Sequence, residues 1–82
     1  MLSEQQIWDR LRTIFSTTLG RDDVVLTVET TARDVPGWDS VTHIQLMVAI
    51  ESAFGIRFRT GELAHVENVG QLVQRISRRI SL

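Results

Sequence analysis

The stretch GWDSVTHIQLMVAIESAFG, residues 37–55, predicts a helix that begins at a serine. Asp39 is a favourable N-cap, residues 40–54 contain neither Gly nor Pro, and Gly55 is placed to end the helix. A group attached to the Ser40 hydroxyl would project from the first turn, and the negative charge of a phosphodiester there would face the unpaired N–H groups and the positive end of the helix dipole. The apolar side chains cover more than half of the helix circumference, which predicts a central helix: they are Ile44, Met47, Val48, Ile50 and Phe54.

A second helix is predicted over residues 4–19, on the N-terminal side of this stretch. Ser3 and Gln6 have the spacing of a capping box, and Gly20 is placed to end the helix. Apolar residues recur with helical period: they are Ile7, Leu11, Ile14, Phe15 and Leu19.

A third helix is predicted after Asn68, which can cap it. Its apolar stripe comprises Val69, Leu72, Val73, Ile76 and Ile80. We expect the arginines at its C-terminal end to be solvated, because cations suit that end of the dipole. They are Arg75, Arg78 and Arg79.

The connecting segments lack this period. Residues 24–28 could form a strand, but no second run exists to pair with it, so residues 21–39 are predicted to be a long ordered loop. A single helical turn is plausible around Thr60 to His65. The predicted fold class is all-α: a small bundle of three main helices plus one short helix, with a long loop between the first two, in one domain over residues 1–82.

Composition excludes several classes of function. The chain has 82 residues, a net charge of −1 and no Cys, so it offers no electrostatic case for nucleic acid and no disulfide or thiolate metal site. No apolar run reaches the ~20 residues of a membrane span, and a cytoplasmic location is expected. Eighty-two residues can hardly enclose an active site, so catalysis is not expected.

Ser40, His43 and Asp39 invite comparison with a serine hydrolase. No glycine spacing of a nucleophile elbow surrounds Ser40, and no oxyanion segment is evident. His43 and His65 lack the carboxylates or cysteines that would complete a metal site. Trp8 and Trp38 are interpreted as packing residues, Trp38 pinning the loop beside Ser40.

The wider pattern over roughly residues 34–80 resembles the acyl carrier protein family. Val41 stands where the family usually has Leu, which is a mild departure. The residues that carry the resemblance are Asp39-Ser40-Val41, Ile44, Leu46, Ile50-Glu51, Phe54-Gly55-Ile56, Phe58, Glu62-Leu63-Ala64 and Asn68-Val69-Gly70-Gln71-Leu72.

The resemblance implies that a phosphopantetheinyl transferase attaches 4′-phosphopantetheine from coenzyme A to Ser40, with Asp39 as helix cap and transferase recognition residue. The thiol of the arm would hold an acyl or aminoacyl group as a thioester for loading enzymes and downstream synthase enzymes. The chain itself would be a monomer with no catalytic residues. The alternative is a helical protein-protein interaction module without a prosthetic group.

The resemblance also implies an acyl pocket and a partner face. The pocket would lie between the second helix and the short helix, among Ile50, Phe58, Leu63 and Val66, with Leu72 possible. Phe58 is larger than the Ile often found there, so a closed pocket and a short or polar cargo are expected. The partner face would comprise Val41, Thr42, Gln45, Val48, Glu51 and Ser52.

Only Glu51 of that face is acidic, so shape and apolar contact are expected to govern recognition. Fatty acid, polyketide and nonribosomal peptide systems all use such carriers. The non-acidic helix and the Trp38-Asp39-Ser40 form favour a polyketide, specialised lipid or related secondary-metabolic pathway.

Overall fold

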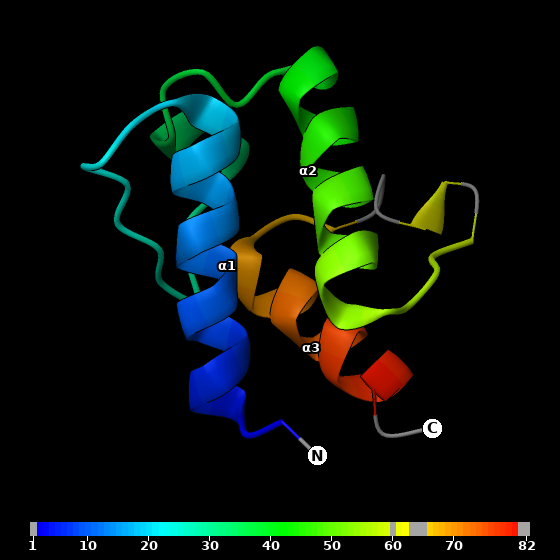
Figure 1. The fold of residues 1–82 in the computed structure, drawn as a ribbon. Helices are drawn as coiled ribbons and strands as arrows, with labels where there is room; N and C mark the ends of the chain where they lie inside the picture. Colours follow the sequence, from blue (N-terminus) through cyan, green and yellow to red (C-terminus); the bar gives the residue numbers. More distant parts are fainter. Residues whose placement is uncertain (1, 60, 63–65, 81–82) are drawn as a thin grey trace.

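The computed structural model describes residues 2–59, 61–62 and 66–80. Within them the chain forms the α-helices α1 (Glu4–Leu19), α2 (Ser40–Phe54) and α3 (Val69–Ile80), a 3₁₀ turn η1 (Ala32–Asp34), and no strand. α1 and α2 stand side by side and α3 crosses below them (Figure 1). The predicted all-α fold with a long loop before α2 is confirmed. Positions 60 and 63–65 of the expected short helix lie outside the described residues.

The core lies where α1 packs against both α2 and α3. α2 buries only Leu46 and Ile50 fully, while Ile44 and Val48 are 62% and 60% exposed. The prediction that this helix is central is therefore wrong: α2 has one face on α1, and no described element covers the opposite side. The buried apolar residues are Ile7, Leu11, Phe15, Leu26, Val35, Leu46, Ile50, Val69, Leu72, Val73 and Ile76.

The helix ends follow the local signals. Gln6 N donates to Ser3 Oγ over 3.2 Å and Ser3 N donates to Gln6 Oε1 over 2.8 Å, which completes the predicted capping box. Gly20 and Gly55 end α1 and α2 with φ of 66° and 65°, the left-handed conformation that favours glycine. No helix in the described part of the chain combines the length and the apolarity needed to span a bilayer.

The loop between α1 and α2 supplies hydrogen-bond acceptors to the start of α3. Val69 N donates to Thr30 O over 2.8 Å, and Gly70 N donates to Val28 O over 3.0 Å. Asn68 Oδ1 accepts from Gln71 N over 2.9 Å, as expected of a cap. The backbone donors that a helix start leaves unpaired are therefore satisfied partly by a segment about forty residues away in the sequence.

The same loop is held by its own side chains. Leu26 and Val35 are buried, and the buried Thr30 hydroxyl accepts from Thr27 N over 2.8 Å. The turn η1 was not predicted, although Thr31 and Asp34 have the spacing of a capping box; Thr31 N donates to Asp34 Oδ2 over 3.0 Å. The expectation of an ordered loop is confirmed.

Glu62 connects the segment before α3 to the exposed side of that helix. Its carboxylate contacts Arg79 Nη2 at 2.5 Å and Arg75 Nη1 at 3.4 Å. Arg59 N also donates to Glu62 Oε1, and this bond is the main reason that the pKa of Glu62 is lowered, with the arginines adding to it. The side chains of Arg75 and Arg79 stay 37% and 29% exposed, so this helix end is partly solvated as expected, but the two arginines also bind the Glu62 carboxylate, whose side chain is 10% exposed.

Replacing Gly70 with Ala is expected to destabilise the protein although Ala is the better helix former. A Cβ there would lie 2.5 Å from Val28 Cγ1 and 2.9 Å from Val28 O, so the loop or the helix must move. Overpacking costs about 1–3 kcal/mol, against a gain of about 1 kcal/mol in helix propensity. The thermal midpoint should fall below that of Gln74→Ala, an exposed control on α3. A midpoint at or above the parent's would show that this approach does not constrain the fold.

Candidate functional site

Ser40 is the first residue of α2 and its side chain is exposed. No described residue forms a hydrogen bond with its Oγ. The backbone around it is fixed: Thr42 Oγ1 accepts from Asp39 N over 2.8 Å and donates to Gly37 O over 2.7 Å. A free hydroxyl is therefore presented from a rigid helix start.

Asp39 is the N-cap of α2. Its Oδ1 accepts from Val41 N and Thr42 N, each over 3.0 Å. These bonds, that of Thr42 first, lower the pKa of Asp39. Because the folded-state pKa is depressed, the charged cap stabilises α2 at neutral pH, and this contribution is lost as the pH falls through that lowered value.

The occupied donors correct one expectation from the sequence. A phosphodiester on Ser40 was expected to face unpaired N–H groups at the helix start, but those of Val41 and Thr42 already bind Asp39. The positive end of the helix dipole remains, with a carboxylate beside it. An anion on Ser40 would therefore meet the dipole but would not be bound by the N–H groups of Val41 and Thr42.

Trp38 joins the loop to both neighbouring helices. Its ring meets Phe15 of α1 edge to face, with centroids 5.0 Å apart. Its Nε1–H donates to His43 Nδ1 of α2 over 3.1 Å, and the two rings are stacked at 6.1 Å. The aromatic contact and the hydrogen bond are each typically worth about 0.5–1.5 kcal/mol. The predicted packing role of Trp38 is confirmed, whereas its bond to His43 was not predicted.

This bond removes the basis for a serine hydrolase. His43 accepts from the Trp38 indole, and the described residues include no hydrogen bond between His43 and Ser40. Asp39 is directed to backbone N–H groups and does not orient the imidazole. The contact between nucleophile and base that such a mechanism requires is thus not formed.

Metal binding has no support in the described residues. They contain no group of three or more potential His, Cys, Asp or Glu ligands. His65, the predicted partner of His43 in the rejected metal pair, lies outside the described residues.

Two hollows lie next to each other at the Ser40 end of α2. The first is an open depression of about 550 Å³ beside the Ser40 hydroxyl, lined by Ala32, Trp38, Asp39, Ser40, His43, Ile44 and Val66. The second is a buried apolar cavity of about 10 Å³, lined by Phe15, Trp38, His43, Leu46, Met47, Ile50, Val66 and Leu72. Three residues border both hollows: Trp38, His43 and Val66.

The predicted acyl-pocket residues occupy different places. Ile50 and Val66 line the buried cavity, together with Leu72. Phe58 is half-buried and packs against the core without lining the cavity. Leu63 lies outside the described residues.

The predicted partner face is divided by the structure. Val41, Gln45, Val48 and Ser52 are exposed. Thr42 belongs to the helix cap, and Glu51 Oε2 accepts from Phe58 N over 2.9 Å, so this carboxylate faces the chain after α2.

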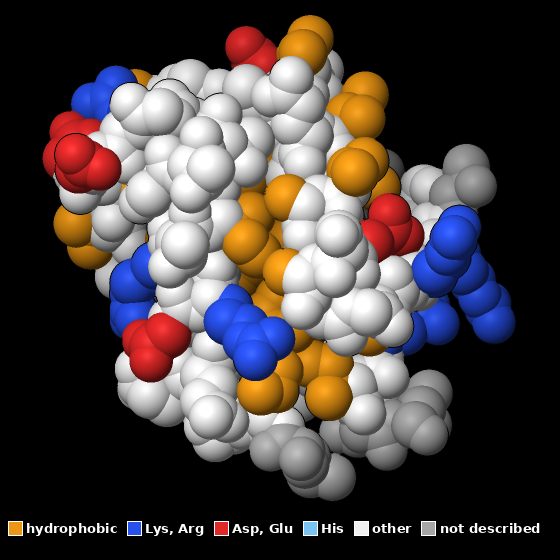
Figure 2. Space-filling view, viewed as in Figure 1, with side chains coloured by type: hydrophobic (Ala, Val, Ile, Leu, Met, Phe, Trp, Pro, Cys, Tyr) orange, Lys and Arg blue, Asp and Glu red, His pale blue; other side chains and the backbone are white. Residues whose placement is uncertain are grey.

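Ile44, expected in the core, is instead exposed on α2 beside two members of the predicted face. Val41 is 65% exposed, and Ile44 and Val48 are exposed nearly as much. We call these three residues the apolar strip. Figure 2 shows hydrophobic side chains gathered along the outer edge of the upper half of α2.

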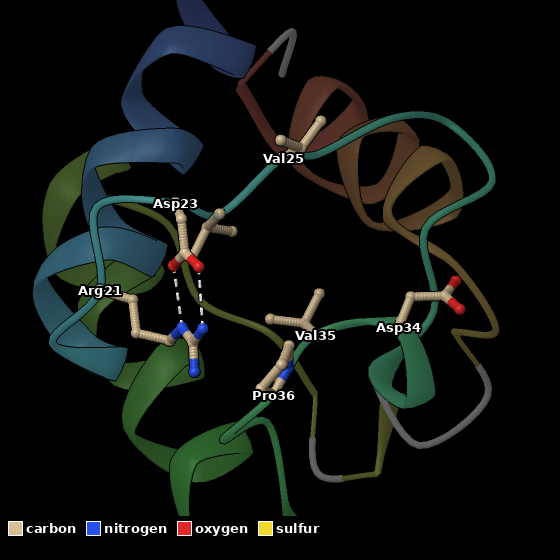
Figure 3. Close-up of a pocket in the computed structure, with 7 residues that line it drawn as sticks. Arg21, Asp23, Val25, Asp34, Val35 and Pro36 are labelled. Carbon is tan, nitrogen blue, oxygen red and sulfur yellow. Dashed lines mark hydrogen bonds and ion pairs between the residues drawn. The ribbon is translucent and has the colours of Figure 1, made fainter.

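Another hollow, of about 170 Å³, lies in the loop away from Ser40 (Figure 3). On one side Arg21 forms a two-bond ion pair with Asp23, at 2.9 and 2.8 Å, which raises the pKa of Arg21 and lowers that of Asp23. On the other side Asp34 is bound to Thr31. Arg21 and Asp23 bind each other and Asp34 binds Thr31, so these charged side chains do not indicate a ligand site in this hollow.

Comparison with known proteins is consistent with the geometry at Ser40. Residues 9–76 match the family model described as "Phosphopantetheine attachment site". The acyl carrier proteins of Guillardia theta and Thermotoga maritima are 31% and 30% identical to this chain over 80 residues, covering 98% of it and 99% of each relative. The solution NMR structure of holo acyl carrier protein from Geobacter metallireducens superposes with a TM-score of 0.82 at 38% identity, covering 89% of this chain and 84% of that one.

The family model spans most of the chain, and the two curated relatives align over nearly their whole length. The matched region includes the start of α2 and the long loop before it. The prosthetic group of this family is covalently attached 4′-phosphopantetheine, and its members are carriers that work with synthase enzymes and do not catalyse reactions themselves. The chain therefore belongs to the acyl carrier protein family.

Proposed function

We propose that Ser40 is the attachment site and that the arm on it carries acyl or aminoacyl intermediates as thioesters. The observation that carries this proposal is an exposed hydroxyl with no hydrogen bond to any described residue, at the fixed start of α2. In the loading step the Ser40 Oγ–phosphorus bond forms while the bond to the nucleotide part of coenzyme A breaks, and the hydroxyl proton passes to the transferase.

The surroundings of Ser40 fit such an arm. The open depression beside the hydroxyl offers room and is bordered by apolar side chains and one carboxylate. Since Asp39 occupies the N–H groups of residues 41 and 42, the phosphodiester is not clamped to the helix. A tethered, mobile thioester can meet several enzymes in turn at high effective concentration.

Asp39 has a second role in this proposal, as a recognition residue for the transferase. Its carboxylate is exposed, ionised and held in one orientation by α2. It lies next to the reacting hydroxyl, so the same group that caps the helix can mark the serine for modification.

Partner enzymes are proposed to dock on the apolar strip. Val41, Ile44 and Val48 lie along α2 over the two turns that follow Ser40, while the acidic Glu51 is bound to the backbone of Phe58. A surface of this kind recognises partners by shape and apolar contact, since exposed charges chiefly steer association and are screened by salt.

The proposed pathway is polyketide, specialised lipid or related secondary metabolism, in preference to housekeeping fatty acid synthesis. The apolar strip, in place of an acidic helix face, and the Trp38-Asp39-Ser40 sequence support this choice. Its partners would be a loading enzyme for acyl or aminoacyl groups and downstream synthase enzymes. A cytoplasmic location, a monomeric state and one domain over residues 1–82 stay predictions from the sequence.

Ser40→Ala is expected to abolish loading. The side chain packs against nothing in the core, so helicity and melting should be nearly unchanged. Intact mass, measured after incubation with coenzyme A and a broad-range transferase, should rise by one phosphopantetheine in the parent and in Ser52→Ala, a control at an exposed serine of α2, and should stay constant in Ser40→Ala. Modification of Ser40→Ala at another residue would refute the assignment, and an unmodified parent would favour an interaction module without a prosthetic group.

Val48→Asp is expected to weaken partner recognition more than Glu51→Gln, because the first puts a charge into the apolar strip and the second keeps an acceptor for Phe58 N. The measurement is kcat/KM for loading by the transferase that modifies this chain, and for transfer by a partner synthase, at low and high salt. Weak salt dependence is expected in the parent. A steep salt slope, or a larger loss with Glu51→Gln, would show that charge governs recognition.

A further inference from the structure

His43 lies one turn after Ser40 on α2, and both side chains line the open depression beside the serine. Residues three apart on a helix are neighbours on its surface, with Cβ atoms about 5–6 Å apart. A group attached to the Ser40 hydroxyl is therefore within reach of the imidazole. The bond of His43 to Trp38 uses one ring nitrogen and leaves the other for such a group.

The Trp38 indole determines which nitrogen of His43 carries the hydrogen. The indole N–H can only donate, and it donates to His43 Nδ1 over 3.1 Å. Nδ1 is therefore the unprotonated nitrogen, and the neutral imidazole carries its hydrogen on Nε2. The indole itself is held by its edge-to-face contact with Phe15, so the fold sets this tautomer.

The Nε2–H group of His43 has no acceptor in the described part of the chain. The bond at Nδ1 is the hydrogen bond that the imidazole makes, and no polar side-chain atom of the described residues is both buried and unpaired. Nε2 is therefore accessible to solvent. The buried cavity that His43 also lines has an apolar surface, so the N–H is directed to the open depression.

The depression offers few other donors to an anion on Ser40. Of the described residues that line it, none is Arg or Lys. The Trp38 N–H is bound to His43, and the Ser40 hydroxyl loses its hydrogen when it becomes an ester. Two backbone N–H groups of the first turn of α2 already bind the cap carboxylate. Among these lining residues, His43 Nε2–H is thus the side-chain donor that remains.

We propose that His43 binds the prosthetic group, with its Nε2–H donating a hydrogen bond to a phosphodiester oxygen of the arm on Ser40. The inference rests on the proposed attachment of the arm to Ser40. A hydrogen bond to an ionised oxygen is stronger than one between neutral groups. One such bond orients the phosphate end over the depression and leaves the thiol end mobile. Trp38 is then a positioning residue, which acts by fixing the tautomer of His43.

The first test is the ³¹P NMR signal of the holo protein at about pH 8, where an ordinary imidazole is neutral. His43→Phe keeps a ring without nitrogen, so the signal should move toward its position in the same protein unfolded in urea. His43→Gln, whose amide can accept from the indole and donate to the phosphate, should stay closer to the parent. Gln45→Ala, an exposed control on α2, should match the parent. Equal signals in the parent and in folded His43→Phe would overturn the inference.

The second test observes the imidazole and leaves His43 in place. In ¹⁵N-labelled His65→Gln, prepared without a histidine tag, the remaining imidazole is that of His43. Its ¹⁵N shifts should show the hydrogen on Nε2, and this hydrogen should exchange with water more slowly in the holo form than in the apo form. Adding Trp38→Phe, which keeps a ring but removes the indole donor, should allow both tautomers and speed the exchange. A hydrogen on Nδ1, or exchange that loading does not slow, would overturn the inference.

Intact mass separates this inference from the function on which it rests. A parent that acquires no arm would overturn both. A loaded parent whose ³¹P signal does not respond to His43→Phe, or whose imidazole does not respond to loading, would overturn the inference alone.

Discussion

The Trp38 indole connects the three parts of the molecule that meet at the start of α2. It packs on Phe15 of α1, bonds to His43 of α2 and is itself the last residue of the long loop before the helix cap. The backbone N of Trp38 also donates to Val35 O over 3.1 Å, which ties the backbone of Trp38 to a buried residue of the loop. The positions of Asp39 and Ser40 therefore depend on the Trp38 side chain, which contacts α1 through Phe15 and α2 through His43.

The long loop makes structural contacts both in its middle and at its end. Its middle supplies the carbonyls of Val28 and Thr30 to the first N–H groups of α3, and Gly70 lets the two backbones approach. Its end carries Trp38 to the serine. Ordering a loop of this length costs conformational entropy. Its contacts with α1, α2 and α3 offset that cost. The position of the loading site therefore depends on the whole fold and not on α2 alone.

Short sequence signals predicted the ends of the helices. The ends of α1 and α2 followed from Ser3, Gly20, Asp39 and Gly55, because caps and left-handed glycines act within one turn. Ser40 was singled out by its position at a helix start and by resemblance to a family. The Trp38–His43 bond was missed, because a residue before the cap and one after it have no fixed helical spacing and meet only once Phe15 holds the indole.

The sequence also did not predict the directions of several side chains. The apolar residues of α2 outnumber those it can bury, so the sequence could not show that Ile44 would be exposed or that α1 would make the larger contacts with the other two helices. Glu51 was assigned to the partner face, yet its carboxylate accepts from Phe58 N. Glu62 likewise finds Arg75 and Arg79 through the path of the chain after α2.

The central claim is that Ser40, at the fixed start of α2, is the residue that carries the arm. Tandem mass spectrometry of proteolytic peptides measures this directly, after the protein has been incubated with coenzyme A and a broad-range transferase. The account predicts that the phosphopantetheine is found on Ser40 alone. An arm on another residue would contradict it.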